Sequence, residues 1–423
     1  MAYTILRQNY KLILNTVISV LLLFNIFFFN TLVVKAVDGD DDFELPLDAK
    51  AAILIDANSG EILYEKNKDE ERAPASTIKI VTALLTLENL DLNTVVTTDR
   101  DTVLSIPSGA TAIYLQEGEK MKASDLLKAT IIKSANDSAA VLAKEIAGSK
   151  EDFATMMNDR VAQLGLTNTH FTNSNGLDEN ENYTSAYDLA MIMRECIKNE
   201  EFMELIQLTD YTLPATNKHN EQYIFSGDNL IIEQSKYYYE YAVGGKTGYT
   251  GDAGFTMVSL AEKDGMKLIA VTLGNSSKVD RYTDAKTLYD YGFNNFILKS
   301  FPRSDFQNKT YEFTKADISF ELNEDISMLV PIAKKDSVFS YKYEVLNEND
   351  PDNITALINL YLDNEFVRPI FLTKIVDNYS LTDFKMPFNP LQNIFTIISI
   401  VIFIFLLIIF CLRFFHYNLK MLK

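Results

Sequence analysis

The sequence predicts an α+β fold in which an antiparallel sheet is flanked by helices and carries a helical lobe. Strand-like runs stand near both ends of residues 44–300, and between residues 77 and 198 apolar residues recur every three or four positions. That period is typical of helices packed on a core. Strands at both sequence ends with helices between them predict one sheet plus a helical insertion. Such a fold would place a site in the cleft between sheet and lobe.

The individual elements follow from local patterns. Residues 51–66 hold two apolar runs around an Asn-Ser-Gly turn, and residues 253–274 hold two β-rich runs joined at Asp264-Gly265. Both are hairpin patterns. Helices are expected in the runs "IKIVTALLTLENL", "ASDLLKATII", "SAAVLAKEIAG" and "SAYDLAMIMREC", and a last helix in "TDAKTLYDYGFNNFI". After Pro302, short alternating runs predict a small β-rich domain over residues 303–385, such as a sandwich.

The two ends of the chain carry candidate targeting and membrane-anchoring segments. Residues 12–34 are strongly apolar and follow Arg7 and Lys11, and Ala36 is a candidate cleavage point; residues 1–36 are expected to be a signal peptide or an uncleaved N-terminal anchor. Residues 394–412 predict a transmembrane helix, followed by a basic tail at residues 413–423. Because positive residues stay cytoplasmic, we expect one C-terminal span in the cell membrane with the bulk of the protein outside.

Composition excludes several functions. The 423 residues carry a formal net charge of −19, which argues against nucleic acid as a partner because phosphate contacts require clustered Lys and Arg. The two cysteines, Cys196 and Cys411, are not expected to pair because Cys411 lies in the apolar C-terminal run. The three histidines are scattered without metal-ligand spacing. We therefore expect no metal and no other cofactor.

The stretch "APASTIKIVTALL" at residues 73–85 places Ser76 and Lys79 one turn apart at a helix start. Serine becomes a strong nucleophile only when an adjacent base takes its proton. Lysine can be that base if burial or a neighbouring cation lowers the pKa of its ammonium group. The helix N-terminus also offers unpaired N–H groups to a developing oxyanion. Alone, the S-x-x-K spacing also fits a helix cap followed by a solvated lysine.

Two further triplets favour the catalytic interpretation. "KSANDSAA" places Ser134 and Asn136 between two helical runs, and "GGKTGYTGDAGF" places Lys246, Thr247 and Gly248 just before a predicted strand. The chain contains one S-x-x-K and one K-T-G. In this order, the set matches the S-x-x-K, S-x-N and K-T-G motifs of penicillin-binding proteins and serine β-lactamases.

The chain resembles the low-molecular-mass penicillin-binding proteins that are serine-type D-alanyl-D-alanine carboxypeptidases. The resemblance runs from about residue 51 to residue 297 and includes "NTHFTNSNGLDENENYTSAYDLA" and the "DR" at residues 280–281. It implies a penicillin-binding/β-lactamase-like catalytic domain at residues 44–300, with peptidoglycan stem peptides and β-lactam antibiotics as ligands. The resemblance implies no residue roles in the β-rich domain.

For the catalytic groups, the resemblance implies that Ser76 is the acylated nucleophile and Lys79 its general base. Ser134 would pass a proton to the leaving amine. Asn136 would hydrogen-bond the substrate backbone and help to fix Lys79. A water molecule would then hydrolyse the acyl-enzyme.

For substrate binding, the resemblance implies that Lys246 and Thr247 meet the terminal carboxylate and that Gly248 allows a close approach. The backbone N–H groups of Ser76 and Tyr249 would form the oxyanion hole. Some family members carry an arginine in the segment before K-T-G, and residues 226–245 hold none. Arg281 is therefore a candidate for binding the carboxylate or for holding Thr247 in position, with a plain surface charge as the alternative.

Other functions remain open on the residues alone. A serine β-lactamase shares the triplets, but Glu179 and Glu181 do not stand in the E-x-x-L-N pattern of the class A enzymes. A DD-endopeptidase that cuts cross-links uses the same chemistry. A non-enzymatic, membrane-anchored wall-binding protein with a relic site is a third possibility, against which the intact Ser76, Lys79 and Lys246 argue.

Overall fold

The computed structural model describes residues 44–226, 229–306, 310–312, 317–347 and 353–377. The expected signal peptide or anchor, the apolar span at residues 394–412 and the basic tail lie outside these residues. Among the described helices, none combines the length and apolar character needed to cross a bilayer. The described residues divide into two compact units: residues 44–301 together with Ile326–Ser337, and those within Pro302–Asp325 together with those within 338–377.

The first unit is built on a five-stranded antiparallel sheet in the order β2-β1-β9-β8-β7. Its strands are β1 (Ala51–Asp56), β2 (Ile62–Lys66), β7 (Ala242–Thr250), β8 (Gly254–Lys263) and β9 (Met266–Asn275). Asp264 and Gly265 join β8 to β9 with φ values of +51° and +80°, as a tight hairpin turn requires. Both expected hairpins are therefore confirmed, and β1 pairs with the distant β9.

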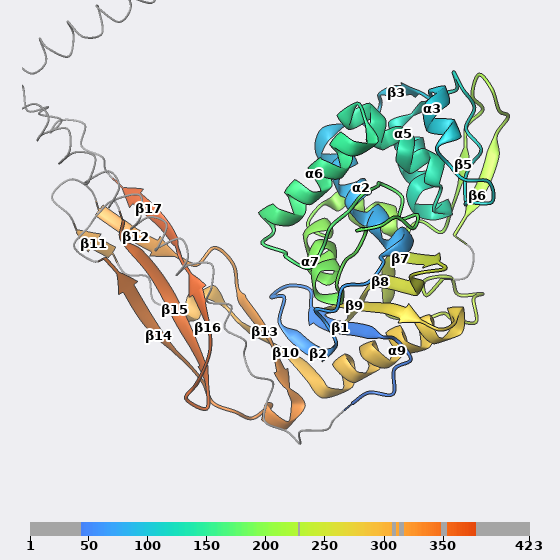
Figure 1. Cartoon of the computed structure of the whole chain (residues 1–423). Helices are drawn as coiled ribbons and strands as arrows, with labels where there is room; N and C mark the ends of the chain where they lie inside the picture. The colour runs from blue at the N-terminus through green and yellow to red at the C-terminus, as the bar shows by residue number, and fades with distance from the viewer. Residues whose placement is uncertain (1–43, 227–228, 307–309, 313–316, 348–352, 378–423) are drawn as a thin grey trace, which may run out of the picture. The chain divides into compact units, whose positions relative to one another are not determined.

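Helices cover both faces of this sheet (Figure 1). Alternation along β1 directs Ile53 and Ile55 into a core shared with α2 (Lys79–Asn89) and α7 (Ala186–Cys196). Leu54 points to the other face, where α9 (Lys278–Asn295) packs. Ile53, Leu54 and Ile55 are fully buried, and burying each such side chain contributes about 1.5–3 kcal/mol.

A helical lobe stands between β2 and β7 in the sequence. Its further helices are α3 (Arg100–Leu104), α4 (Ala123–Lys128), α5 (Asn136–Ala147), α6 (Lys150–Gln163) and α8 (Glu200–Gln207), with the hairpins β3 (Val95–Thr97)/β4 (Lys120–Lys122) and β5 (Asp210–Leu213)/β6 (Gln222–Phe225). The expected helical runs are confirmed, with one refinement: the run at residues 123–132 forms α4 and then a π-helical turn, Ala129–Lys133. Such π-turns often mark functional positions.

The remaining strands belong to both units. In the first unit, β10 (Phe296–Phe301) pairs antiparallel with β13 (Ile326–Pro331). The second unit is β-rich and contains two three-stranded antiparallel sheets. One is β11 (Thr310–Glu312), β12 (Asp317–Glu321) and β17 (Thr373–Asp377); the other is β14 (Phe339–Leu346), β15 (Thr355–Leu362) and β16 (Glu365–Phe371).

Candidate active site

Ser76 and Lys79 meet at the start of α2. Ser76 lies in a 3-10 turn, Ala75–Ile78, and Lys79 is the first residue of the α-helix. Lys79 Nζ lies 2.8 Å from Ser76 Oγ, so the expected pairing on one helix face is confirmed. Ala75 has φ of +47°, a left-handed conformation that costs a non-glycine residue energy and is concentrated at functional sites.

The Lys79 amine is fully buried and has three neighbours. Besides Ser76 Oγ, Nζ lies 2.8 Å from Asn136 Oδ1 and 2.5 Å from the carbonyl oxygen of Asn175. Both of these oxygens can only accept hydrogen bonds. A neutral amine has two N–H groups and one lone pair, so the two acceptors use the N–H groups and the lone pair is left for the Ser76 hydroxyl. In its neutral form, the Lys79 amine would therefore direct its lone pair toward Ser76.

The environment also favours the neutral form of this amine. Burial is the main cause that holds the pKa of Lys79 well below its usual value, and the nearby Lys246 ammonium lowers it further, while Asp137 opposes the shift. Burial, followed by the charge of Arg281, lowers the pKa of Lys246 to about 7. Desolvation disfavours a buried ammonium group unless a counter-charge compensates. Lys79 therefore loses its proton more readily than an exposed lysine.

The Asn175 carbonyl is a functional group that the sequence analysis missed. Asn173 Oδ1 accepts the backbone N–H of Asn175 at 3.2 Å and that of Gly176 at 2.7 Å, which fixes this turn. Gly176 has φ of +81°, and a Cβ on it would stand 1.9 Å from the Ala75 carbonyl oxygen. The Asn-Gly pair at residues 175–176 was the available signal, since it typically marks a tight turn. No side-chain pattern reveals a carbonyl contact.

Ser134 and Asn136 stand at the junction between two helical segments, as expected. Ser134 follows the π-helical turn with φ of +62° and ψ of +33°, and Asn136 opens α5. The N–H of Asn136 donates to the carbonyl of Thr111 at 2.8 Å. The structure brings Asn136 directly to Lys79. For Ser134, no hydrogen bond to Lys79 or Lys246 forms within the described residues.

The K-T-G triplet corrects one expectation. Lys246, Thr247 and Gly248 do precede the predicted strand, β8, but they themselves lie within a strand that was not predicted, β7. The run "GGKTG" has low β-propensity, and the strand exists because residues 242–250 pair with β8. Strand β7 is the edge of the sheet. Lys246 is 4% exposed, and its Nζ donates to the Thr247 carbonyl at 2.9 Å.

Gly248 is packed against Ser76. A Cβ at this position would stand 2.7 Å from the Ser76 nitrogen, 2.8 Å from Ala75 Cβ and 2.5 Å from Thr256 Oγ1. Real Cβ atoms do not approach backbone this closely, so any side chain would push β7 away from the 3-10 turn. Glycine at position 248 therefore sets the distance between the strand and Ser76.

Gly248→Ala is expected to lower the rate of penicillin acylation about tenfold to a hundredfold. A displacement of reacting groups by about 1 Å lowers reaction rates by factors of this size. Stopped-flow acylation measures the effect. Gly251→Ala is the matched control, since a Cβ on Gly251, in the turn after β7, meets nothing within 4 Å. Equal acylation rates in the two variants would contradict the packing argument.

Arg281 lies on α9 and is not a surface residue, being 5% exposed. Its Nη1 donates to the Gly248 carbonyl at 2.9 Å and its Nη2 to the Tyr282 hydroxyl at 3.2 Å, while Nε has no partner among the described residues. The guanidinium group thus fastens β7 at the residue after Thr247. Tyr249, the next residue, is 60% exposed and its ring lies 4.4 Å from that of Phe255.

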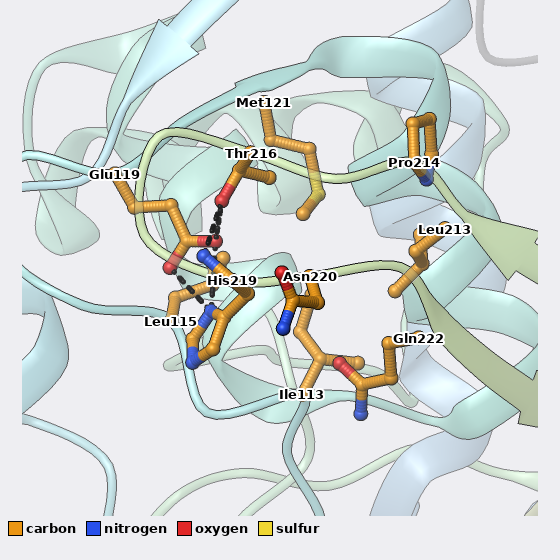
Figure 2. A pocket seen from close by; sticks show the side chains of 10 residues that line it. All are labelled: Ile113, Leu115, Glu119, Met121, Leu213, Pro214, Thr216, His219, Asn220 and Gln222. Atoms are coloured by element: carbon orange, nitrogen blue, oxygen red, sulfur yellow. Dashed lines mark hydrogen bonds and ion pairs between the residues drawn. The ribbon is translucent and has the colours of Figure 1, made fainter.

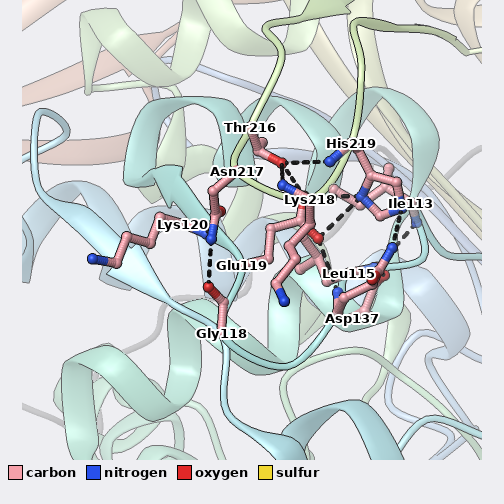
Figure 3. A network of polar contacts seen from close by, with 11 residues as sticks. Ile113, Leu115, Gly118, Glu119, Lys120, Asp137, Thr216, Asn217, Lys218 and His219 are labelled. Carbon is pink, nitrogen blue, oxygen red and sulfur yellow. Dashed lines mark hydrogen bonds and ion pairs between the residues drawn. The ribbon is translucent and has the colours of Figure 1, made fainter.

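Two buried carboxylates hold the segment of residues 111–119 beside α5. Asp137 Oδ1 accepts the N–H of Ile113 at 3.2 Å, and Oδ2 accepts that of Leu115 at 3.0 Å. Because Asp137 follows Asn136, these bonds connect the segment to the S-x-N motif. Figure 3 shows this network continuing to Glu119.

Glu119 fastens the tip of the β5–β6 hairpin. Its side chain is fully buried, and its carboxylate lies 2.9 and 3.0 Å from His219 Nδ1 and accepts from Thr216 Oγ1 at 2.7 Å and from the N–H of Gln116 at 2.9 Å. Figure 2 shows the same pair on the wall of a small pocket. The sequence analysis gives His219 no function. In the structure it is a hydrogen-bond partner of the buried Glu119 side chain, and such partners offset the loss of hydration on burial.

Comparisons with known proteins agree with this geometry. The family model described as D-alanyl-D-alanine carboxypeptidase matches residues 39–277. D-alanyl-D-alanine carboxypeptidase DacF of Bacillus subtilis (strain 168) is 36% identical over 262 residues, which cover 61% of this chain and 66% of that protein. DacC of Escherichia coli (strain K12), also named a D-alanyl-D-alanine carboxypeptidase, is 31% identical over 298 residues, covering 67% and 72%.

Solved structures give the same result. Penicillin binding protein 5 from Haemophilus influenzae is similar with a TM-score of 0.67 and 25% identity, covering 80% of this chain and 99% of that one. A D-alanyl-D-alanine carboxypeptidase from Mycobacterium tuberculosis H37Rv has a TM-score of 0.55 and 30% identity, covering 61% and 96%. The chain belongs to the D-alanyl-D-alanine carboxypeptidase family and is an enzyme of peptidoglycan metabolism.

Proposed function

We propose that the chain removes the terminal D-alanine from peptidoglycan stem peptides that end in D-Ala-D-Ala, through an acyl-enzyme on Ser76. The observation that carries the proposal is the buried Lys79 amine, which has two carbonyl acceptors for its N–H groups and the Ser76 hydroxyl 2.8 Å from its third position. A serine hydroxyl becomes an activated nucleophile when an adjacent base accepts its proton. No metal or other cofactor takes part in the proposed steps.

The reaction has two steps. In the first, Ser76 Oγ attacks the carbonyl carbon between the two D-alanines while its proton passes to Lys79 Nζ. The leaving D-alanine amine receives a proton through Ser134, and the C–N bond breaks. In the second step, water adds to the ester carbonyl, and the Ser76 oxygen leaves with a proton. One water molecule is consumed for each D-alanine released.

The edge strand is suited to hold the substrate backbone. Edge strands offer unpaired N–H and C=O groups to an extended peptide, and β7 lies at the edge beside the 3-10 turn that carries Ser76. The N–H groups of Ser76 and Tyr249 serve as the oxyanion hole. The close approach at Gly248 supports this assignment, since a Cβ there would stand 2.7 Å from the Ser76 nitrogen.

Thr247 and Lys246 bind the terminal carboxylate in this proposal, and Arg281 acts on it through β7. The Arg281 bond to the Gly248 carbonyl supports holding Thr247 in position, which was one of the two roles considered from the sequence. β-Lactam antibiotics bind in the same place, because their strained amide carbonyl is attacked by the same serine. Penicillin therefore leaves an ester on Ser76.

We further propose that the catalytic unit faces the outside of the cell membrane, tethered by residues 394–412. The support is the charge-free apolar run followed by a basic tail, together with the location of peptidoglycan itself outside that membrane. The tether is not part of the proposed chemistry.

The test is the release of D-alanine by the full-length protein. The purified protein is expected to release one D-alanine from each stem pentapeptide and to leave the tetrapeptide intact, as measured by mass spectrometry. Intact cells that express the chain should do the same with added pentapeptide, which is charged and stays outside. Faster cleavage of cross-linked dimers would favour an endopeptidase, rapid penicillin turnover a β-lactamase, and no hydrolysis a wall-binding protein.

A further inference from the structure

Asn136 and Asp137 open α5 side by side, and the reaction proposed above uses only the first of them. Asn136 Oδ1 lies 2.8 Å from Lys79 Nζ, and α5 packs against α2, the helix that begins with Lys79. Asp137 is 4% exposed and lies in the first turn of α5. A buried carboxylate therefore stands one residue from a side chain that contacts the proposed base.

The Asp137 carboxylate binds backbone N–H groups. Oδ1 accepts those of Ile113 at 3.2 Å and Ser138 at 2.9 Å, and Oδ2 accepts that of Leu115 at 3.0 Å; Figure 3 shows the two bonds to residues 113 and 115. Three donors are suited to an ionised carboxylate, which can only accept hydrogen bonds. Asp137 forms no ion pair with any residue that the structure describes, so no adjacent cation cancels its charge.

The same bonds fix the segment beside Asn136. The two residues that donate to Asp137 from this segment flank Tyr114, which has φ of +65° and is 72% exposed. A left-handed conformation costs a non-glycine residue energy, and the bonds on either side help to offset that cost. The Asn136 N–H donates to the Thr111 carbonyl at 2.8 Å. Residues 111–115 and the first turn of α5 are thus tied together, which holds the asparagine side chain beside the base.

The negative charge of Asp137 also acts on Lys79. Burial and the Lys246 ammonium group lower the pKa of Lys79, whereas Asp137 raises it. The proposed acylation puts a positive charge on Lys79 as it takes the Ser76 proton, and a nearby negative charge stabilises that ammonium form. A general base works best when its pKa is not far below the working pH. Asp137 therefore opposes the two causes that would make Lys79 a weak base.

Other ionisable side chains around α2 and α5 have partners of their own. Burial and Arg281 are the causes that lower the pKa of Lys246. Among these groups, Asp137 is the negative charge that raises the pKa of Lys79. The pairs formed in this region are Lys144 with Asp99, Arg160 with Glu88 and Glu195, Asp125 with Tyr211, Glu119 with His219, and the Cys196 thiol with the Ile80 carbonyl.

We propose that Asp137 is a positioning residue of the acylation step: its carboxylate ties residues 111–115 to α5, holds Asn136 beside Lys79 and places a negative charge near the base. The inference rests on the proposed role of Lys79 as the base for Ser76. Asp137 acts through these neighbours, without contact to the reacting atoms, and lies just outside the S-x-N motif.

The experiment measures the rate of penicillin acylation of the full-length protein across pH by stopped flow. In Asp137→Asn the plateau rate at high pH should fall about tenfold, because the base is weaker and Asn136 is held less firmly. The rise in rate should also move to lower pH, since losing a negative charge disfavours the Lys79 ammonium form. At a pH where the wild-type protein acylates at about a tenth of its plateau rate, the variant should reach about a quarter of its own plateau or more.

Glu119→Gln is the matched control. Glu119 is likewise a buried carboxylate that binds this part of the chain, through the N–H of Gln116 at 2.9 Å, but it does not adjoin Asn136. It should keep the wild-type pH profile. Asp137→Glu retains the charge and should keep the profile with a lower plateau, because its longer side chain cannot make the same bonds. Asp137→Ser is a second uncharged variant and should show the same displacement as Asp137→Asn.

Circular dichroism selects the variants that are folded. An unchanged pH profile or an unchanged plateau in the folded uncharged variants would overturn the proposal, as would an equal displacement of the profile in Glu119→Gln. If penicillin did not acylate the wild-type protein, or did so at a rate independent of pH, the proposed role of Lys79 as the base would fail instead.

Discussion

Ser76→Ala is expected to lower kcat for D-alanine release by at least about 10⁴-fold, because the acyl-enzyme cannot form without the nucleophile. The same change should abolish covalent labelling by penicillin, which intact-protein mass spectrometry measures directly. Ser76 Oγ is the hydroxyl paired with the Lys79 amine at 2.8 Å.

Ser108→Ala is the control for this change, since Ser108 is an exposed serine of the same unit. It should retain normal labelling and hydrolysis. An adduct that persists in Ser76→Ala, on whatever residue peptide mapping reveals, would refute Ser76 as the nucleophile. Thermal unfolding of both variants checks that the lost labelling is not lost folding.

Lys79→Arg is expected to lower the penicillin acylation rate by about 10²- to 10⁴-fold, the usual contribution of a general base. A guanidinium group stays protonated at all working pH values and cannot take the Ser76 proton. In the wild-type protein, acylation should rise as pH increases through the lowered pKa of Lys79, because only the neutral amine is a base. Stopped-flow acylation at several pH values shows whether the variant loses this rise.

Lys144→Arg provides the comparison, since Lys144 is a half-exposed lysine paired with Asp99. It should acylate at the wild-type rate with the wild-type pH profile. Comparable acylation by Lys79→Arg would mean that Lys79 acts as a charged partner and not as the base. Circular dichroism excludes gross misfolding, which a buried guanidinium group could otherwise cause.

The parts of the fold that follow from local patterns were predictable. The turn at Asp264-Gly265 and the alternation of residues 51–66 specify hairpins within a few residues, and both are present. Strand β7 was misjudged because "GGKTG" contains few strand-forming side chains, and its conformation is decided by pairing with β8. Such long-range pairing overrides local propensity.

In the candidate active site, too, contacts between residues close in sequence were predictable and long-range contacts were not. The Ser76–Lys79 spacing on a helix is local, so their contact was predictable. The Asn175 carbonyl was not, because a backbone oxygen carries no residue-type signal and comes from a loop 96 positions away. The burial of Arg281 was equally hidden, since it depends on how α9 packs against β7.

The two buried lysines also affect the thermodynamics of folding. In the unfolded chain both would keep their protons up to about pH 10.4, whereas in the folded enzyme the pKa of Lys246 is lowered to about 7 and that of Lys79 is also lowered. Between those values the unfolded state binds more protons, so this pair makes the free energy of unfolding rise with pH. At neutral pH the enzyme therefore gives up conformational stability, and the surrounding core must offset the loss. Activity and stability oppose each other at this centre, and substitutions that weaken the core reduce the margin that offsets the lowered pKa values of the two lysines.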